Sequence, residues 1–285
     1  MTRVRRLVAP LQTWWLRSFL VAIPLVTVVP VPWWGHWTVL VALIGLSTVR
    51  PPRRDDARPV AVRAPVRGRW AALNSPGTSV PSHGVRAYGQ AFAVDIAHPR
   101  ADDAAGAVGW GLRQRRAEEY TSFGEPVTAV AAGTVVAVTS GLRDHRARST
   151  WPGIAFMLTV EGFVREIDGA RFVVGNHVVI DHGDGVFSLS AHLRRGSATV
   201  RPGDTVPSGA RLGEVGNSGN TSEPHLHVQL MDHPRPTAAA GLPFRWTDIR
   251  QDPGDADPTW ARGPVSTDIV DGLPANGQVF TAGAD

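Results

Sequence analysis

The pattern of hydrophobic and polar positions divides the chain into two unlike parts. Residues 18–49 run without Asp, Glu, Arg or Lys for 32 positions and are rich in Val, Leu and Ile. From about residue 83, short β-branched runs alternate with turns that contain Gly and Asp. Such runs are typical of strands, and no long stretch with a 3.6-residue period lies between them. The pattern therefore predicts an apolar N-terminal segment followed by a β domain.

Short strands joined by tight turns are typical of antiparallel sheets. We therefore expect an all-β fold, an antiparallel β-sandwich or open barrel, over residues 83–250. Residues 139–171 are expected to form a long solvated loop between two strands, which could border a substrate groove. The predicted strands are residues 127–131, 134–138, 176–180, 186–193, 200–206 and 209–215.

The apolar segment predicts a membrane anchor over residues 1–50. About 20 apolar residues cross a bilayer as a helix, so the run is long for one span and short for two. Pro24, Pro30 and Pro32 and the Trp-rich residues 33–37 lie mid-stretch, where they suit the turn of a helical hairpin or an interfacial belt. A single transmembrane helix with its N-terminus inside would place the following domain outside the cytoplasm, whereas a two-helix hairpin would return it to the cytoplasm. We favour the single helix on functional grounds. A cleaved signal peptide and a buried core helix are the alternatives.

Charge is concentrated near the N-terminus. Residues 1–70 hold eleven arginines against Asp55 and Asp56, so the rest of the chain is net negative although the whole is +4. The basic balance therefore belongs to the membrane segment, and no nucleic-acid partner is expected. The chain has no Cys, and all 29 of its basic residues are Arg. Disulfides and thiolate zinc sites are excluded, so His and carboxylate groups must hold any metal.

Two further segments lack periodicity. Residues 51–82 are rich in Pro, Arg and small residues and predict a linker. Residues 251–285 are rich in Asp, Gly and Pro and predict a poorly ordered tail.

A polar, glycine-rich loop at residues 216–224 runs into two histidines. Side chains on a strand alternate between faces, so His225 and His227 would point to one side while Leu226 and Val228 face the core. Imidazole is a common zinc ligand and the usual acid or base near neutral pH. The pair suits a metallohydrolase, although His-x-His alone is a weak signal.

Four blocks occur in one order: Pro126-Val127-x-Ala129-x-x-x-Gly133-Thr134-Val135, Ala191-His192-Leu193, Gly203-Asp204-x-Val206-x-x-Gly209 and Gly216-Asn217-Ser218-Gly219-Asn220-Thr221-x-x-Pro224-His225-Leu226-His227. Together they resemble the lysostaphin-type zinc metallopeptidases, the LytM-like peptidoglycan endopeptidases. The resemblance covers roughly residues 83–245, and its last block is highly specific. It implies a β-sandwich, one zinc per chain and a peptide of the bacterial cell wall as substrate.

The resemblance also assigns residues. It makes Asp95 and His227 zinc ligands and His192 and His225 catalytic histidines. The family's remaining ligand stands four residues before the Asp, where this chain has Ala91, which has no donor atom.

The missing ligand needs a replacement. The run Ala87-Tyr88-Gly89-Gln90-Ala91-Phe92-Ala93-Val94-Asp95 is similar to divergent branches of the family that take their first ligand from farther upstream, which predicts His83. Alternatively, His83 is a solvated turn residue and His98 or His182 completes the site, or no zinc binds.

Three protein ligands would leave the fourth position to a water, whose pKa zinc lowers toward about 7. His192 or His225 would remove its proton and the other would stabilise the oxyanion; the sequence does not decide which. We expect a membrane-anchored zinc endopeptidase with an extracytoplasmic catalytic domain. The alternative is a degenerate relative that binds cell wall or a protein without turnover. A lipoyl-carrier-like module is excluded because the chain has no lysine. The scissile bond and the oligomeric state stay open.

Overall fold

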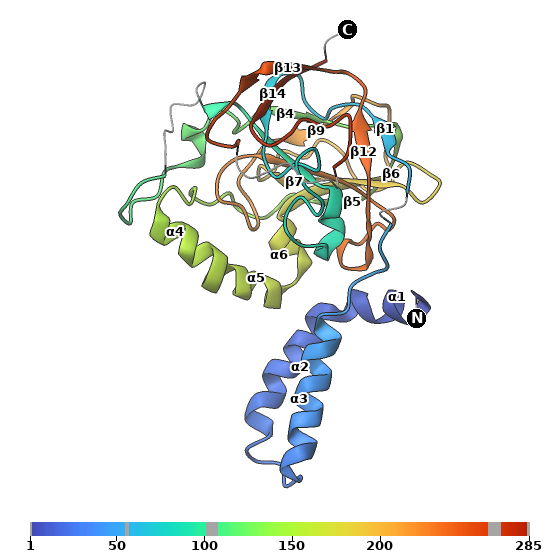
Figure 1. Cartoon of the computed structure of the whole chain (residues 1–285), viewed down its shortest axis with the longest axis vertical. Helices are drawn as coiled ribbons and strands as arrows, with labels where there is room; N and C mark the ends of the chain where they lie inside the picture. The colour runs from blue at the N-terminus through green and yellow to red at the C-terminus, as the bar shows by residue number, and fades with distance from the viewer. Residues whose placement is uncertain (1, 55–56, 101–107, 262–268, 284–285) are drawn as a thin grey trace.

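A β domain carries a helical hairpin that projects from one side (Figure 1). This computed structural model describes residues 2–54, 57–100, 108–261 and 269–283. The expected strands after residue 83 are largely present, and the domain is mostly antiparallel β as predicted.

A ten-stranded antiparallel sheet is the framework of the domain. Nine strands follow the order β13-β14-β2-β3-β10-β7-β6-β5-β8, and β11 pairs with β10 outside this path. The bounds are β2 Gly68–Ala72, β3 Val94–Ala97, β5 Gly133–Thr139, β6 Asn176–Asp181, β7 Phe187–Leu193, β8 Thr205–Val206, β10 Leu226–Met231, β11 Gly241–Leu242, β13 Ile249–Ala256 and β14 Gln278–Ala282.

Two small sheets pack with the main sheet around a shared core. Strand β1 (Val60–Val62) runs parallel to β12 (Phe244–Trp246), and β4 (Pro126–Thr128) runs antiparallel to β9 (Arg211–Glu214). Burial of apolar side chains drives this packing. The core joins all of these layers through Val62, Trp70, Ile96, Val127, Leu212, Leu226 and Phe244.

The two central strands β3 and β10 have one apolar and one polar face. Val94 and Ile96 belong to the shared core. Leu226 and Val228 belong to it too, which confirms the direction predicted for these two residues. Because strand side chains alternate, the residues between them point to the opposite face of the sheet. That face carries the polar side chains described below.

Most of residues 2–47 are helical. Helix α1 (Thr2–Val8) and the 3₁₀ turn η1 (Ala9–Leu11) lead into α2 (Gln12–Leu25), which packs against α3 (Trp33–Ser47). Figure 1 shows α2 and α3 as an antiparallel hairpin, with α1 lying across its base. Pro30 and Pro32 lie in the connection, which fits their inability to continue a helix.

The described residues do not form the predicted single transmembrane helix. Among the described residues, no helix has both the length and the apolarity required to cross a membrane. Helices α2 and α3 have 14 and 15 residues, whereas a span needs about 20. The chain turns at residues 26–32, where the sequence had offered Pro30 and Pro32 as the turn of a hairpin, and the hairpin alternative is what forms.

The sheet also extends beyond residues 83–250 on both sides, which corrects the expected linker and tail. Strands β1 and β2 lie within residues 51–82, and Trp70 is fully buried. Strand β14 lies within residues 251–285 and pairs with both β2 and β13. These strands are stabilised by distant partners, so their local composition did not reveal them. Residues 55–56, 262–268 and 284–285 of the two expected segments lie outside the described residues.

The expected loop at residues 139–171 is corrected too. It contains α4 (Trp151–Phe156), a π-helical turn η5 (Met157–Glu161) and α5 (Gly162–Asp168), followed by α6 (Ala170–Val174). Thr150 caps α4 by accepting a hydrogen bond from the Gly153 N–H, and Pro152 lies in the first turn. Many apolar side chains of this segment are exposed, so the sequence does not show the buried apolar stripe that usually predicts a helix. Short 3₁₀ helices are η2 (Ala87–Phe92), η4 (Ala117–Glu119) and η6 (Pro236–Ala238).

Candidate metal centre

Strand register brings the first two candidate ligands together. In the antiparallel pairing of β3 and β10, Asp95 lies directly opposite His227. The His227 Nδ1 atom is 2.8 Å from Asp95 Oδ1, and both side chains are buried. A register slip of one residue would turn either side chain to the opposite face.

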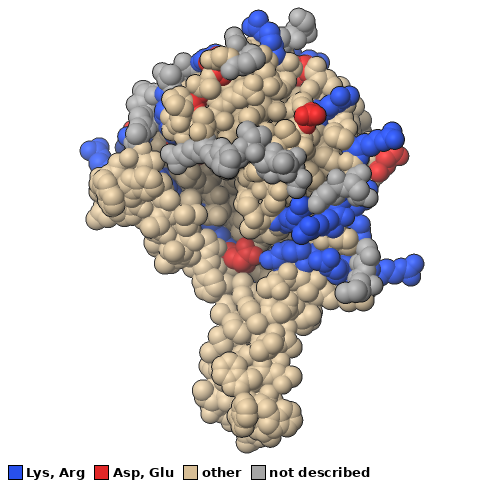
Figure 2. Space-filling view, viewed as in Figure 1, with Lys and Arg blue, Asp and Glu red and all other residues tan. Residues whose placement is uncertain are grey.

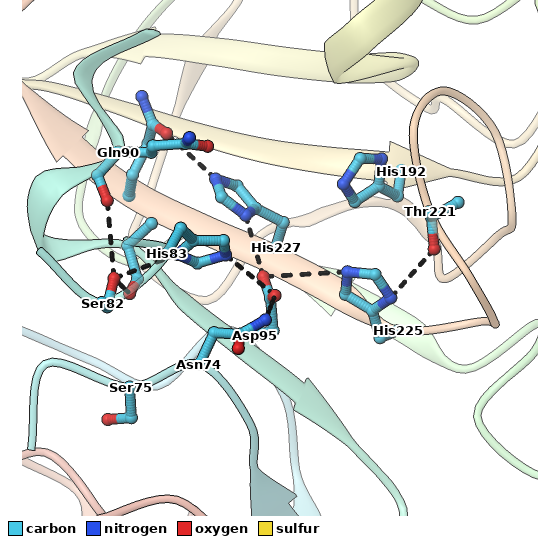
Figure 3. A network of polar contacts seen from close by, with 12 residues as sticks. Asn74, Ser75, Ser82, His83, Gln90, Asp95, His192, Thr221, His225 and His227 are labelled. Atoms are coloured by element: carbon cyan, nitrogen blue, oxygen red, sulfur yellow. Dashed lines mark hydrogen bonds and ion pairs between the residues drawn. The ribbon is translucent and has the colours of Figure 1, made fainter. Parts of the chain in front are cut away.

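His83 completes the group from a loop. Its Nε2 atom lies 2.9 Å from Asp95 Oδ2 (Figure 3). The candidate donor atoms of His83, Asp95 and His227 all lie within 4.8 Å of one another. Ala91 is instead buried in a small apolar cluster with Phe92 and Val270, so its position belongs to the core.

The segment between His83 and Asp95 packs closely on β10. Gly89 has φ +73°, and a Cβ atom there would lie 3.1 Å from both Ala239 Cβ and Gln229 Nε2. Glycine is therefore required by its backbone conformation and by this close approach. The tight packing fixes the path that brings His83 over the sheet.

Hydrogen bonds select the histidine tautomers. The Ser82 hydroxyl donates to the Ala93 carbonyl (2.6 Å), so its lone pair accepts from His83 Nδ1–H (3.0 Å). His83 Nε2 is thereby turned toward the Asp95 carboxylate. The Gln229 amide donates through Nε2 to the Tyr88 carbonyl (2.8 Å). Its Oε1 atom then accepts from His227 Nε2–H (2.9 Å), which leaves His227 Nδ1 facing the site.

This donor set fits zinc. Two imidazole nitrogens and one carboxylate are a usual three-ligand set for a catalytic zinc ion. Each histidine has its remote nitrogen bound to a protein acceptor, and Asn74 Nδ2 donates to Asp95 Oδ2 at 2.9 Å. Such outer partners orient metal ligands.

Charge within the group is complementary. Burial alone would raise the pKa of Asp95, but the adjacent His83, His225 and His227 hold that pKa well below its usual value. Burial alone would lower the pKa of His227, but its hydrogen bond to Asp95 raises that pKa. The hydrogen bond between His227 and Asp95 thus shifts the two pKa values in opposite directions.

His192 approaches the group from β7. Its backbone has φ +60°, a left-handed conformation that is uncommon outside glycine. The 216–219 loop holds it, since the Gly216 N–H donates to its carbonyl (3.1 Å) and its Nδ1–H donates to the Ser218 carbonyl (2.9 Å). Burial, together with His225 and His227, holds the pKa of His192 well below its usual value. His192 is therefore neutral at neutral pH, with Nε2 free.

His225 lies on the side of the Asp95 carboxylate opposite to His83 (Figure 3). Its Nδ1–H donates to the Glu223 carbonyl at 2.8 Å, and its Nε2 atom is 3.7 Å from Asp95 Oδ1. The ring centroids of His192 and His225 are 5.0 Å apart. All five predicted site residues are thus gathered at one face of the sheet (Figure 3).

The alternative ligands lie elsewhere. The His98 ring stacks on Trp70 with ring centroids 4.3 Å apart. His182 is bound through Nδ1 to the Ala132 carbonyl and through Nε2 to the Ser188 hydroxyl. Neither belongs to the His83, Asp95 and His227 group.

Sequence reasoning missed the residues that support the site. Gln229 could have been found, because it follows His227 by two positions and shares its face of β10. Asp144 had no such signal: its carboxylate accepts from the N–H groups of Asn217 (2.7 Å) and Arg195 (2.9 Å). Next to it, His145 Nε2 lies 2.9 Å from the Gly219 carbonyl. These two residues brace the loop that holds His192.

The four histidines of the site line a cavity of about 950 Å³. Met157, Leu158 and Glu166 of the helical segment form part of its wall, and Arg50 and Arg53, which follow α3, form another part. The cavity is large enough for an extended peptide segment, since small-molecule sites span about 300–1,000 Å³.

Comparisons with known proteins agree with the resemblance in the sequence. Residues 156–239 match the family model described as Peptidase family M23. Over 72 residues the chain is 40% identical to the peptidoglycan DD-endopeptidase ShyA of Vibrio cholerae. These aligned residues make up 25% of this chain and 16% of that protein. The match thus spans less than a fifth of that relative's length.

Solved structures of peptidases are similar over larger shares of the chain. The antimicrobial peptidase lysostaphin from Staphylococcus simulans is 19% identical, with 58% of this chain and 48% of that chain covered and a TM-score of 0.31. A zinc-containing peptidase from Vibrio cholerae is 17% identical, with 65% and 39% covered and a TM-score of 0.31. The family match includes His192, His225 and His227, whereas His83 and Asp95 precede it.

Proposed function

Given that residues 156–239 carry a peptidase family M23 domain, we propose that this chain is a zinc metalloendopeptidase that hydrolyses peptide bonds in bacterial peptidoglycan. The observation that carries the proposal is the group of His83, Asp95 and His227, with donor atoms within 4.8 Å of one another, beside two further histidines. The cell-wall substrate is supported by the peptidoglycan endopeptidase that the chain matches.

The three ligands would hold one zinc ion per chain, which when bound supplies a Lewis acid and lowers the pKa of a bound water toward about 7. Ser82 and Gln229 keep the ligand histidines in the tautomers that leave one nitrogen free for metal. The Asp95 carboxylate stays ionised because its pKa is lowered by its neighbours.

His192 and His225 would handle the proton. Each has its Nδ1–H bound to a backbone carbonyl, so each turns its Nε2 atom toward the cavity. The histidine that accepts the proton of the attacking water then donates it to the leaving amine. The other histidine, in its protonated form, would donate a hydrogen bond to the oxyanion.

A catalytically inactive relative is the second candidate, and the reason for considering it was Ala91. His83 offers a donor atom 2.9 Å from Asp95, which supports His83 as the replacement for the ligand missing at Ala91. We therefore favour the enzyme.

We also propose that the α2–α3 hairpin attaches the chain to a membrane without crossing it, with the β domain on the extracytoplasmic side where peptidoglycan lies. Exposed side chains of the hairpin are largely apolar, among them Val21, Val28, Trp33, Trp34, Trp37 and Val41. The hydroxyls of Thr38 and of Thr48, the residue after α3, donate to backbone carbonyls of α3, which suits a water-free environment.

The test is cleavage by the purified full-length chain. With zinc, it should release new amino groups from peptidoglycan sacculi, detected by mass spectrometry of the soluble fragments. The His225→Gln variant and the chelator-treated protein should release none above background, and added zinc should restore only the latter. Binding of sacculi by the zinc-loaded protein without new amino groups would support the inactive relative instead.

A further inference from the structure

A small basic pocket lies at the base of the hairpin. Its volume is about 170 Å³, and its lining contains five arginines: Arg5, Arg50, Arg53, Arg54 and Arg86. The remaining lining residues are Pro, Ala and Gly. Figure 2 shows the basic side chains gathered where the hairpin meets the domain, while the hairpin below is uncharged on the face in view.

No Asp or Glu lines this pocket among the described residues, although Glu166 lines the adjoining large cavity together with Arg50 and Arg53. Asp232 pairs with Arg6 at 3.1 Å and with Arg54 at 3.6 Å, but it does not line the pocket. Neighbouring arginines repel one another, and the repulsion is stronger where the surroundings have a low dielectric constant. An anion bound between the arginines would offset this repulsion. The planar guanidinium group suits phosphate oxygens, to which it can donate two parallel hydrogen bonds.

The pocket is continuous with the apolar hairpin. Arg50 follows the end of α3 at Ser47 by three residues, and its Nη1 atom donates to the Ser47 carbonyl at 2.8 Å. A helix rises about 1.5 Å per residue, so α3 extends about 22 Å from this point. The hydrocarbon core of a bilayer is about 30 Å thick, with headgroups immediately outside. With the hairpin in the hydrocarbon, the arginine pocket lies at headgroup depth.

A second apolar surface lies on the same side. Phe156, Val160, Phe163 and Val164 are about half exposed and follow helical spacing on the α4–α5 segment. That segment meets the hairpin where Arg17 Nε donates to the Ile167 carbonyl at 2.7 Å. Figure 1 shows α5 beside the base of the hairpin and α1 across it, as helices lying in an interface would be placed.

We propose that the arginine pocket at the base of the α2–α3 hairpin binds the phosphate headgroup of an anionic phospholipid. The inference rests on the proposed attachment of the hairpin to a membrane and is independent of the zinc chemistry. A bilayer is the occupant that satisfies both features, because its acyl region covers the hairpin while its phosphates reach the pocket.

The test is flotation of the full-length chain with vesicles of phosphatidylcholine alone or of phosphatidylcholine and phosphatidylglycerol in equal parts. We expect tighter binding to the anionic vesicles. The double variant Arg5→Gln/Arg53→Gln should lose about fivefold in anionic-vesicle affinity per arginine removed. The matched control Arg113→Gln/Arg195→Gln changes the same charge at exposed positions away from the hairpin and should retain the preference.

The charge-conserving variant Arg5→Lys/Arg53→Lys separates a headgroup site from diffuse attraction. A site built on guanidinium geometry should lose affinity with Lys; full retention would overturn the pocket while leaving membrane attachment intact. Equal binding of the wild type to both vesicle types would overturn it too. Failure of the wild type to bind either vesicle, for example because it self-associates through the hairpin, would overturn the attachment itself. None of these outcomes depends on peptidase activity.

Discussion

His227 Nδ1 lies 2.8 Å from Asp95 Oδ1 because these residues face each other across β10 and β3. Two candidate ligands distant in sequence are therefore positioned by backbone pairing alone. The third, His83, depends on a loop that is fixed by the close approach of Gly89 to β10. Zinc affinity should consequently be sensitive both to the ligands and to their supports.

The His83→Ala variant should bind zinc much more weakly than the wild type. Loss of a direct ligand should cost more than the 10–100-fold that is typical for an outer partner. We expect about one zinc per wild-type chain, measured by metal analysis and competitive titration. The matched control is His182→Gln, which removes a histidine outside the group and should keep its zinc; a zinc content unchanged in His83→Ala would remove His83 from the site.

The Gln229→Leu variant should weaken zinc binding by about 10–100-fold without unfolding the protein. The reason is that Gln229 Oε1 holds the Nε2–H tautomer of His227, and Leu is similar in size but accepts no hydrogen bond. Competitive zinc titration measures the effect, with circular dichroism as the check on folding. Gln90→Leu changes another amide beside the cavity and should have little effect; equal losses in both variants would argue against the tautomer explanation.

His192→Gln and His225→Gln should each retain zinc yet lower kcat by about 10²–10⁴-fold, the usual contribution of a positioned acid or base. Neither residue belongs to the group of candidate ligands, so metal content and activity should separate. Rates on a peptidoglycan fragment across a range of pH, together with zinc analysis of the same samples, test this. If either variant loses its zinc in parallel with its activity, that histidine contributes to zinc binding and not to proton transfer.

His177 should make the fold less stable in mild acid. Burial lowers its pKa in the folded protein, while the unfolded value is about 6.5. Above that value both states are neutral; as pH falls below it, the unfolded state binds the proton first, so the free energy of unfolding decreases. The decrease is at most about 1.4 kcal/mol per pH unit until the folded pKa is reached.

The measurement is urea unfolding of the wild type and of His177→Gln between pH 7.5 and 5. The variant should show a shallower loss of stability toward low pH. Parallel curves for the two proteins would mean that His177 does not contribute to the acid sensitivity.

Residues with local periodicity were predictable from the sequence, whereas residues ordered by distant partners were not. The alternation around His225 and His227 correctly placed Leu226 and Val228 in the core. Trp70 and Phe280 gave no such signal, because each lies on a strand whose partner is far away in sequence: β2 and β14 pair with each other. The roles of the site residues stay predictions, and the structure brings all five of these residues to one face of the sheet.

The helical segment at residues 151–168 was missed for a different reason. Phe156 and Phe163 are exposed, so the segment lacks the buried apolar stripe by which a helix packed on a domain is recognised in a sequence. Asp144 was also unpredictable, because its role depends on backbone N–H groups of Asn217 and Arg195 that only the fold brings near.

The position of β2 between β14 and β3 sets practical limits on how the chain can be shortened. A fragment beginning at residue 83 would look complete from its motifs, yet it would lack the strand that flanks β3 and would leave the strand bearing Asp95 at an open edge. Removal of the C-terminal residues would strip β2 of its other neighbour. A fragment for crystallisation or assay should therefore begin before Val60 and extend through Ala282, and one that omits Arg50 and Arg53 also loses part of the cavity wall.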